Sequence, residues 1–235
     1  MGQYPYRSEQ PGWIDGRTAE SGLRERAFFR SVYAWMFGGL MLTAAAAVWV
    51  ALSPAMRSIV MPLRWVLLIA ELGMVFYLSF RIQKISAATA ASLFLVYSLL
   101  NGLTLSIIFL AYNLPTIFQA FISAAGMFGA MSIYGMVTKR SLASWGSFLM
   151  MGVIGLVIAS VVNIFLKSSP MGWIISVIGV FVFLGLTAYD TQKLKSYAQA
   201  GELRENLAII GALALYLDFI NLFLFMLRLF GGNRR

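Results

Sequence analysis

The chain has 235 residues, of which 60% are hydrophobic and 11% are charged, and its mean hydropathy is +0.80. This composition excludes an ordinary soluble protein, because the surface of such a protein must be far more polar, and it makes lipid the expected solvent. The net charge of +9 comes from Lys and Arg residues placed singly or in pairs at the ends of apolar runs, a pattern that suits phospholipid headgroups and not nucleic acid.

The first 30 residues are rich in charged side chains and turn formers, and we expect residues 1–30 to form a polar cytoplasmic tail. A cleavable signal peptide would need an apolar stretch soon after its basic start, which this tail lacks. From residue 31 onward, apolar runs alternate with short polar breaks. Since about 20 apolar residues cross the hydrocarbon core, the chain predicts seven membrane-spanning helices, at residues 31–52, 63–82, 87–111, 116–137, 145–166, 172–192 and 207–229.

The weakest of the predicted breaks is the short segment Asn113-Leu114-Pro115. Without it the third and fourth spans would fuse into an improbably long apolar run, so we keep the break. The sequence therefore predicts an all-α membrane domain at residues 31–230 and a short basic tail at residues 231–235. On the side of the N-terminal tail lie 12 of the 18 Lys and Arg residues, which places the N-terminus in the cytoplasm.

Three carboxylates lie inside predicted spans, where an ionised side chain costs about 2.5–3.5 kcal/mol at the bilayer centre. They are Glu71, Asp190 and Asp218. Asp218 follows Leu207 by eleven residues and so lies about 16 Å into the last span. Asn221, three residues later, shares its face. Asp218 is therefore either a functional carboxylate or a polar clasp that is hydrogen-bonded to a neighbouring helix.

Asp190 ends an apolar run and lies about one turn inside the cytoplasmic face, where it could pair with Lys193 three residues later. The sixth and seventh spans must run antiparallel, and they can bring Asp190 close to Asp218 if the last helix begins somewhat outside the bilayer. Repulsion between two carboxylates opposes double ionisation, so the pair would share one proton. Because the chain has no His and no Cys, these are the groups that we expect to sense pH within the membrane.

Glu71 lies midway along the second span, and Arg81 closes that span on the same side as Asp190. An inward-reaching arginine could exchange partners with the aspartates, or Arg81 could be an ordinary basic residue of the cytoplasmic side. Neutral side-chain oxygens could line a cation path with Glu71, or could bond neighbouring helices instead; they belong to Asn101, Thr104, Asn163 and Asn221.

At these residues the sequence resembles the Bax inhibitor (transmembrane BAX inhibitor motif) family of seven-helix proteins. The similar segments are Leu100–Ser106, Val177–Gly179, Ala188–Asp190 and Leu215–Phe223, of which the last is the most specific. Together the similarities extend over nearly all of the membrane region. The acidic turn in the N-terminal tail and the C-terminus close after Phe230 resemble those of family members from bacterial inner membranes.

The resemblance implies a seventh helix enclosed by the other six, and a pH-sensitive calcium leak in which two aspartates form a latch. Asp190 and Asp218 match the aspartate pair of that family, and Glu71 is similar to a glutamate of its second helix. The latch of the family also involves a basic residue at the cytoplasmic end of that helix, for which Arg81 is the nearest candidate here.

These observations lead to the hypothesis of a leak channel or transporter for a hard cation, most plausibly Ca²⁺, with Asp190 and Asp218 as its gate and its metal ligands. The alternative is a regulator that transports nothing and acts through membrane protein partners in protein quality control or in stress and death signalling. In that case the aspartates would only stabilise the bundle. We expect the bilayer and calcium as partners, and no bound cofactor.

An enzymatic function is not expected. An intramembrane aspartyl protease would also carry a Tyr-Asp pair such as Tyr189-Asp190, with a second aspartate on the next helix. However, Tyr216-Leu217 stands before Asp218 where that class has Gly-x-Gly, and no proline follows Pro170 to form its Pro-Ala-Leu element. A serine protease lacks the histidine needed to activate its nucleophile.

Overall fold

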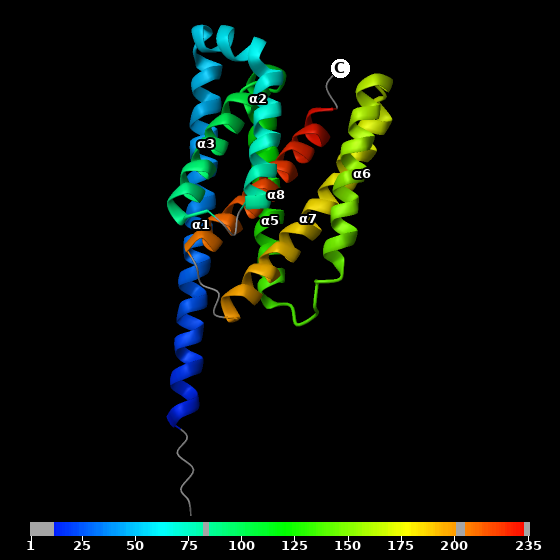
Figure 1. Ribbon diagram of the computed structural model, residues 1–235. Coiled ribbons are helices and arrows are strands. Elements are labelled where there is room, and N and C mark those ends of the chain that lie inside the picture. The colour runs from blue at the N-terminus through cyan, green and yellow to red at the C-terminus, as the bar shows by residue number, and fades with distance from the viewer. Residues whose placement is uncertain (1–11, 82–84, 201–204, 233–235) are drawn as a thin grey trace, which may run out of the picture.

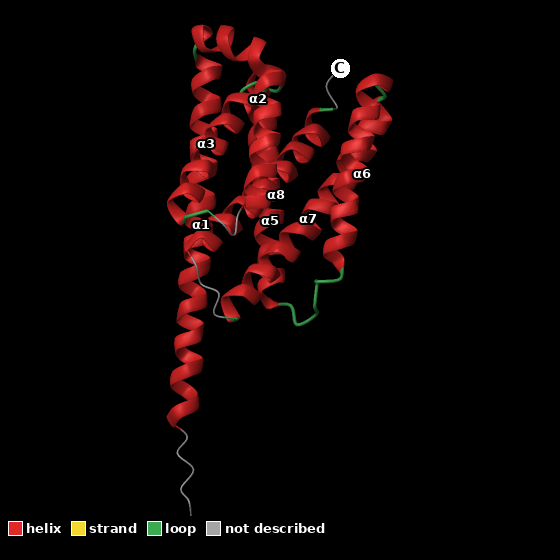
Figure 2. Ribbon diagram, in the orientation of Figure 1, coloured by secondary structure: helices red, strands yellow, loops and turns green. Residues whose placement is uncertain are grey.

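In the computed structural model, residues 12–81, 85–200 and 205–232 are described, and the regular structure in this part of the chain is helical (Figure 1, Figure 2). Among these residues, seven helical segments are long and apolar enough to cross a membrane. The predicted all-α class with seven spans is thereby confirmed. The helices are α1 (Gly12–Leu52), α2 (Pro54–Arg81), α3 (Ala87–Leu105), α4 (Ile108–Ala111), α5 (Leu114–Val137), α6 (Trp145–Leu166), α7 (Ser169–Gln199) and α8 (Glu205–Gly231).

Side-chain caps fix several of the helix starts. The Oδ1 atom of Asn113 accepts hydrogen bonds from the backbone N–H and the hydroxyl of Thr116, at 2.9 and 2.8 Å. This cap, followed by Pro115 in the first turn of α5, confirms the predicted break between the third and fourth spans. The third span itself is divided into α3 and α4 near Ser106, whose hydroxyl bonds back to the carbonyl of Leu103 at 2.6 Å.

Two helices begin well before their predicted spans. Helix α1 begins at Gly12, so residues 12–30 of the predicted polar tail are helical and continuous with the first span. Helix α2 begins at Pro54 and not near residue 63, because Ser53 and Pro54 together form a helix start. Figure 1 shows that the first turns of α2 cross the end of the bundle before the helix turns along it. A proline inside the helix, Pro62, favours such a bend.

Helix α8 is the central helix of the bundle. In its most apolar stretch 67% of the residues are buried, against 11% in α2 and α6, which face outward. It packs against α1, α3, α5 and α7, and Figure 1 shows it running obliquely between them. The predicted central position of the last helix is thus confirmed, and any side chain in its middle is removed from lipid.

Two close contacts fix the register between α7 and α8. Gly211 of α8 lies against Leu194 of α7, and Gly179 of α7 lies against Phe225 of α8. In this antiparallel register Asp218 is level with Thr187 and not with Asp190. Along the helix axis, Asp190 lies about three residues, or roughly 4.5 Å, closer than Asp218 to the C-terminal end of α7.

Candidate functional site

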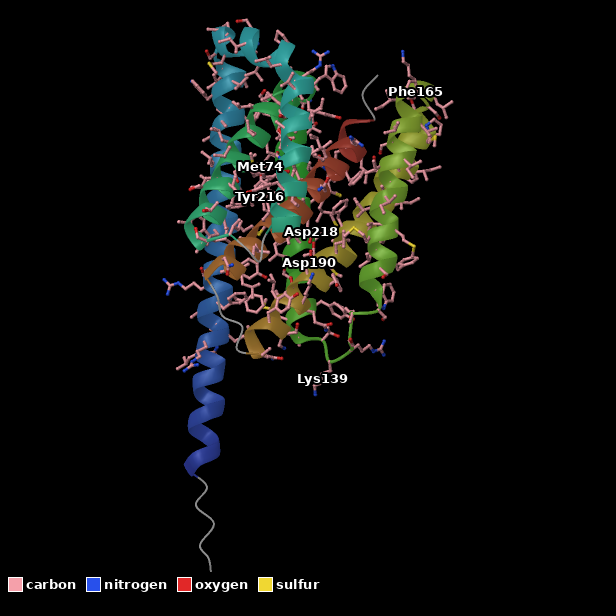
Figure 3. The ribbon with its side chains drawn as sticks, viewed as in Figure 1. Met74, Lys139, Phe165, Asp190, Tyr216 and Asp218 are labelled. Atoms are coloured by element: carbon pink, nitrogen blue, oxygen red, sulfur yellow. The ribbon has the colours of Figure 1, made fainter. Side chains whose placement is uncertain are left out.

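Asp190 and Asp218 lie on adjacent helices within range of direct electrostatic interaction. Figure 3 shows the two residues next to each other inside the bundle, nearer to the end marked by Lys139 than to the end marked by Phe165. Asp218 is only 4% exposed and Asp190 is partly buried. The structure therefore brings together the two aspartates that the sequence singles out, with the deeper one on the central helix.

The extra length of α7 explains how this arrangement arises. The sequence places the end of the sixth span near residue 192, whereas α7 continues to Gln199 before the chain returns. Two further turns carry the start of α8 away from the centre of the bundle. Asp218, near the middle of α8, can then approach Asp190, near the end of the predicted span.

Asp218 has an unusual hydrogen-bonding environment. Its Oδ2 atom is buried and has no hydrogen-bond partner among the described residues, and the same holds for the hydroxyls of Ser132 and Thr191. Thr191 of α7 packs against Gly135 of α5, and Ser132 lies one turn before Gly135 on that helix. Unpaired buried oxygens are unfavourable, so a proton, water or cation would stabilise the unpaired Oδ2 atom of Asp218.

Lys193 is the basic residue that acts on Asp190. Its charge interacts with that of Asp190, and its ammonium group lies 5.8 Å from the centre of the Tyr189 ring. The side chain of Lys193 is exposed. Asp190 therefore interacts electrostatically with a solvated lysine and with the buried Asp218.

A glutamine clamp holds the loop between α5 and α6 against α7. The Oε1 atom of Gln192 accepts a hydrogen bond from the backbone N–H of Leu142 at 2.7 Å, and its Nε2 atom donates to the carbonyl of Arg140 at 2.8 Å. Nearby, Lys195 donates to the carbonyl of Met136 at 2.5 Å and so caps the end of α5. These contacts fix the segment that lies beyond Asp190 toward this end of the bundle.

Glu71 belongs to a second polar cluster. It is 8% exposed and accepts a hydrogen bond from the hydroxyl of Thr104. On the same face of α3, the amide of Asn101 donates to the hydroxyl of Tyr97 at 3.2 Å, while its Oδ1 atom is buried and without a partner in the described structure. Tyr97 and Tyr216 both lie within electrostatic range of Glu71.

Tyr216 connects this second cluster to the central helix. It is fully buried, and its hydroxyl lies 2.6 Å from that of Thr43 on α1. Thr43 also lies 2.9 Å from the carbonyl of Ser98 on α3 and from that of Gly39 on its own helix. Because a threonine hydroxyl has one hydrogen to direct toward a carbonyl, Tyr216 is the donor in the bond to Thr43. This contact joins α1, α3 and α8.

The remaining residues predicted for the site differ in their structural surroundings. Asn221 is partly buried and donates to the carbonyl of Leu217 on its own helix at 2.8 Å. Asn163 accepts from the backbone N–H of Ser168 at 3.1 Å, so it stabilises the turn between α6 and α7. Arg81 ends α2, but its side chain lies outside the described part of the structure.

One cavity in the described structure is largely apolar. It has a volume of about 360 Å³ and lies between α1, α3, α4, α5 and α8. Phe121, Phe219 and Phe223 are among its lining residues, and Thr43, whose hydroxyl is already bonded, is its polar member. No carboxylate lines this cavity, so its chemistry differs from that of either acidic cluster.

Several residues of the two clusters give little signal in the sequence. Tyr97, Tyr216 and Thr43 are common in apolar helices, and the sequence analysis does not select them. A buried tyrosine hydroxyl nevertheless needs a hydrogen-bond partner. Helical spacing could have found Tyr97, because it precedes Asn101 by four residues and so shares its helix face. No such signal was present for Tyr216, which is two residues from Asp218 and faces another side of its helix.

The fold and these clusters define a helical membrane protein with a central carboxylate-bearing helix. The sequence model of the family described as "Inhibitor of apoptosis-promoting Bax1" matches residues 25–235. The chain therefore belongs to the Bax inhibitor-1 family, which confirms the resemblance carried by the segments around Asn101, Asp190 and Asp218.

Relatives from diverse bacteria resemble nearly the whole chain. The inner membrane protein YbhL of Escherichia coli (strain K12) is 49% identical over 217 residues, which cover 89% of this chain and 93% of that protein. An uncharacterized protein of Deinococcus radiodurans is 47% identical over 213 residues, covering 89% and 91%. The protein RP147 of Rickettsia prowazekii is 43% identical over 224 residues, covering 93% and 94%. The Escherichia coli relative is named an inner membrane protein, and the described part of this chain has seven helical segments long and apolar enough to cross a membrane.

Proposed function

We propose that this protein is a pH-sensitive leak pathway for cations, in particular Ca²⁺, gated by Asp190 and Asp218. The observation that carries the proposal is the proximity of two carboxylates on adjacent membrane-spanning helices, one of them with a buried oxygen that lacks a partner. Carboxylates in the membrane are costly and normally face a partner, a proton or an ion path. Family membership supports a role as a membrane channel or regulator.

In the proposed cycle, one proton shared between Asp190 and Asp218 holds α7 and α8 together and closes the path. When the proton leaves, the two negative charges repel each other, and the freed charge attracts a cation. Lys193 stabilises the ionised state of Asp190, since its charge acts on that carboxylate.

The ligand set suits a hard cation that keeps part of its hydration. Ca²⁺ takes 6–8 oxygen ligands, and two carboxylates provide at most four. Among the described residues, no three His, Cys, Asp or Glu side chains gather into one group. The other ligands would then be water and hydroxyls such as that of Thr191. Glu71 and Asn101, with Asn221, would extend the path along the bundle.

The topology proposed for this function places the N-terminus and the loop between α5 and α6 in the cytoplasm. The excess of Lys and Arg on this side supports that orientation. Figure 1 shows α1 projecting beyond the bundle at the end where this loop lies, and the C-terminus at the opposite end. The aspartate pair would then respond to cytoplasmic pH.

Calcium flux into proteoliposomes that contain a calcium-sensitive dye tests the gate. We expect the flux through the wild-type protein to rise with the pH on the side of the α5–α6 loop, by up to about tenfold per pH unit for the loss of one proton. Asp218→Asn and Asp190→Asn should each remove this dependence, because a single carboxylate has no like-charged partner. Glu25→Gln, the same change at the surface of α1, is the matched control and should behave as wild type.

Two results would contradict the proposal. The first is a wild-type pH dependence that survives in Asp218→Asn. The second is the absence of flux from the purified wild-type protein together with a stable membrane protein partner in mild detergent. The second result would favour the regulator alternative, which the family description, naming an inhibitor of an apoptosis-promoting protein, also favours.

A further inference from the structure

A lateral opening between α1 and α5 leaves part of the central helix uncovered. Both helices pack against α8, but they are not among the helix pairs of the described structure that pack extensively on each other. The cavity of about 360 Å³ lies in this gap. Its inner wall is formed by Phe219, Ile220 and Phe223 of α8, which are buried, whereas Phe118 of α5, which also lines it, is 67% exposed. The cavity is therefore open on the outer face of the bundle.

The short helix α4 bridges the two sides of the opening at one end. The third span is interrupted near Ser106, and α4 then packs against both α1 and α5. On α5 the lining residues lie between Leu114 and Phe121, in the first turns of the helix, so the cavity lies toward the end of the bundle opposite to the α5–α6 loop. The exposed lining residues belong to membrane-spanning segments. A ligand would therefore enter sideways, from the hydrocarbon of the bilayer.

The lining of the cavity suits hydrocarbon and no polar group. All of its side chains are apolar except that of Thr43. The hydroxyl of Thr43 is already engaged with the carbonyls of Ser98 and Gly39 and with the hydroxyl of Tyr216. A buried water needs about two to four polar partners, and a buried hydroxyl or carbonyl of a ligand needs at least one. A quinone ring or a sterol hydroxyl would thus lose hydrogen bonds in this cavity, whereas a saturated chain would lose none.

The volume of the cavity is large enough for part of a lipid chain. At about 360 Å³, it exceeds twice the roughly 150 Å³ of an apolar cavity that binds benzene. Apolar volume that stays unfilled is destabilising, because the atoms around it lose dispersion contacts. The bilayer in which the opening lies consists of acyl chains, so these are the apolar ligands at the highest local concentration.

We propose that the opening between α1 and α5 holds one acyl chain of a membrane phospholipid, whose headgroup stays at the membrane surface opposite to the α5–α6 loop. The chain lies against Phe219, the residue that follows Asp218, and against Phe121, whose ring packs edge-on to that of Phe219 with the centroids 5.6 Å apart. The site is a lipid site and does not depend on the proposed ion path, so either can fail without the other.

Photochemical labelling of the purified full-length protein in nanodiscs tests the site. The probe is phosphatidylglycerol with a diazirine in one acyl chain, and mass spectrometry of peptides locates the adducts. We expect adducts on residues 219–223 of α8 in the wild type, although these side chains are largely buried. Ala44→Phe places a ring at the opening and should reduce these adducts at least about tenfold, the change expected when two or three methylene groups lose their burial. Ala45→Phe, at the next exposed position of α1 but outside the cavity lining, should label as wild type.

A second pair of variants keeps the test decisive if Ala44→Phe fails to fold. Ile117→Phe on α5 fills the cavity, and Ile122→Phe is its control at an exposed position that does not line it. Helix content and elution as a single species in detergent establish folding for each variant. Absence of wild-type adducts on residues 219–223 would overturn the proposal, as would equal labelling in each filled variant and its control.

Two other occupants of the opening would also be detected. Stronger labelling of residues 219–223 by a photoreactive quinone than by the phospholipid, at equal concentration, would overturn the assignment to an acyl chain. A second copy of the chain would be recognised with Phe118→Cys, which carries one cysteine because the natural chain has none. Rapid formation of a disulfide-linked dimer by this variant, together with the absence of lipid adducts, would show that a neighbouring copy covers the opening and would overturn the proposal.

Discussion

Tyr216 and Asp218, two residues apart on α8, face opposite sides of the central helix and take part in different polar clusters. Tyr216 bonds to Thr43 and joins three helices, whereas Asp218 interacts with Asp190 of α7. The hydrogen bond of Tyr216 therefore fixes the rotation of the helix that carries the deeper aspartate. A change on one side of α8 is expected to move the group on the other side.

Removing the hydroxyl of Tyr216 should destabilise the bundle. Tyr216→Phe leaves the ring contacts with Phe94 and Tyr97 in place but removes the bond to Thr43. We expect a loss of about 0.5–1.5 kcal/mol in unfolding free energy, measured by denaturation in detergent. Tyr77→Phe, at an exposed position of α2, is the control and should leave stability unchanged. Equal stability of both variants would show that the bond to Thr43 contributes little.

A methyl group at Gly135 should push α5 and α7 apart. A Cβ atom at this position would meet the backbone carbonyl of Ala188, two residues before Asp190, and a backbone atom cannot move away cheaply. Gly135→Ala should therefore cost about 1–3 kcal/mol. Gly129→Ala, on the same helix but with open space around it, should be tolerated. Thermal unfolding of the two variants in the same detergent compares them, and similar midpoints would argue against the close contact.

Neutralising Lys193 should shift the pH response of the cation flux. Its positive charge favours the ionised form of Asp190, so Lys193→Gln makes loss of the shared proton harder. The pH of half-maximal calcium flux should rise relative to wild type. Lys139→Gln removes a charge in the loop at the end of the bundle, farther from the aspartates (Figure 3), and should change the midpoint much less. A midpoint unaffected by Lys193→Gln would remove this lysine from the gate.

Loss of the glutamine clamp should free the loop between α5 and α6. Gln192→Ala removes the acceptor of the Leu142 N–H and the donor to the carbonyl of Arg140. We expect faster hydrogen exchange at the Leu142 amide and faster tryptic cleavage after Lys139 and Arg140. Gln199→Ala on the same helix loses only a 3.4 Å contact to Glu25 and should leave both rates at wild-type values. Unchanged exchange at Leu142 in Gln192→Ala would contradict the clamp.

Hydropathy predicts the number and order of the spans because lipid imposes a long apolar stretch on each of them. It does not predict their ends, since α1 and α7 continue as helices through polar residues that lie outside the apolar stretch. The start of α2 at Pro54 and the division of the third span at Ser106 depend on local capping and side-chain bonds. Such local bonds are weak signals within a strongly apolar sequence.

The residues of the candidate site are likewise only partly predictable from the sequence. Asp190, Asp218 and Glu71 are predictable from the sequence because a carboxylate in the membrane is costly enough to require an explanation. Their hydroxyl partners, such as Thr104 and Tyr97, are tolerated in any membrane helix, so only the three-dimensional contacts distinguish them. Asn163 shows the opposite case. Its side chain has the neutral oxygen expected of a residue in a cation path, but in the structure this oxygen stabilises the turn between α6 and α7.

The central position of α8 also determines the order of events during biosynthesis. Ribosomes make a chain from its N-terminus, so the helices that surround α8 enter the membrane before α8 exists. Those helices contact α8 along its length, and the partners of Tyr216 and Asp218 are already in the bilayer when these residues arrive. The polar clusters that contain Tyr216 and Asp218 are therefore completed only after translation has passed these two residues.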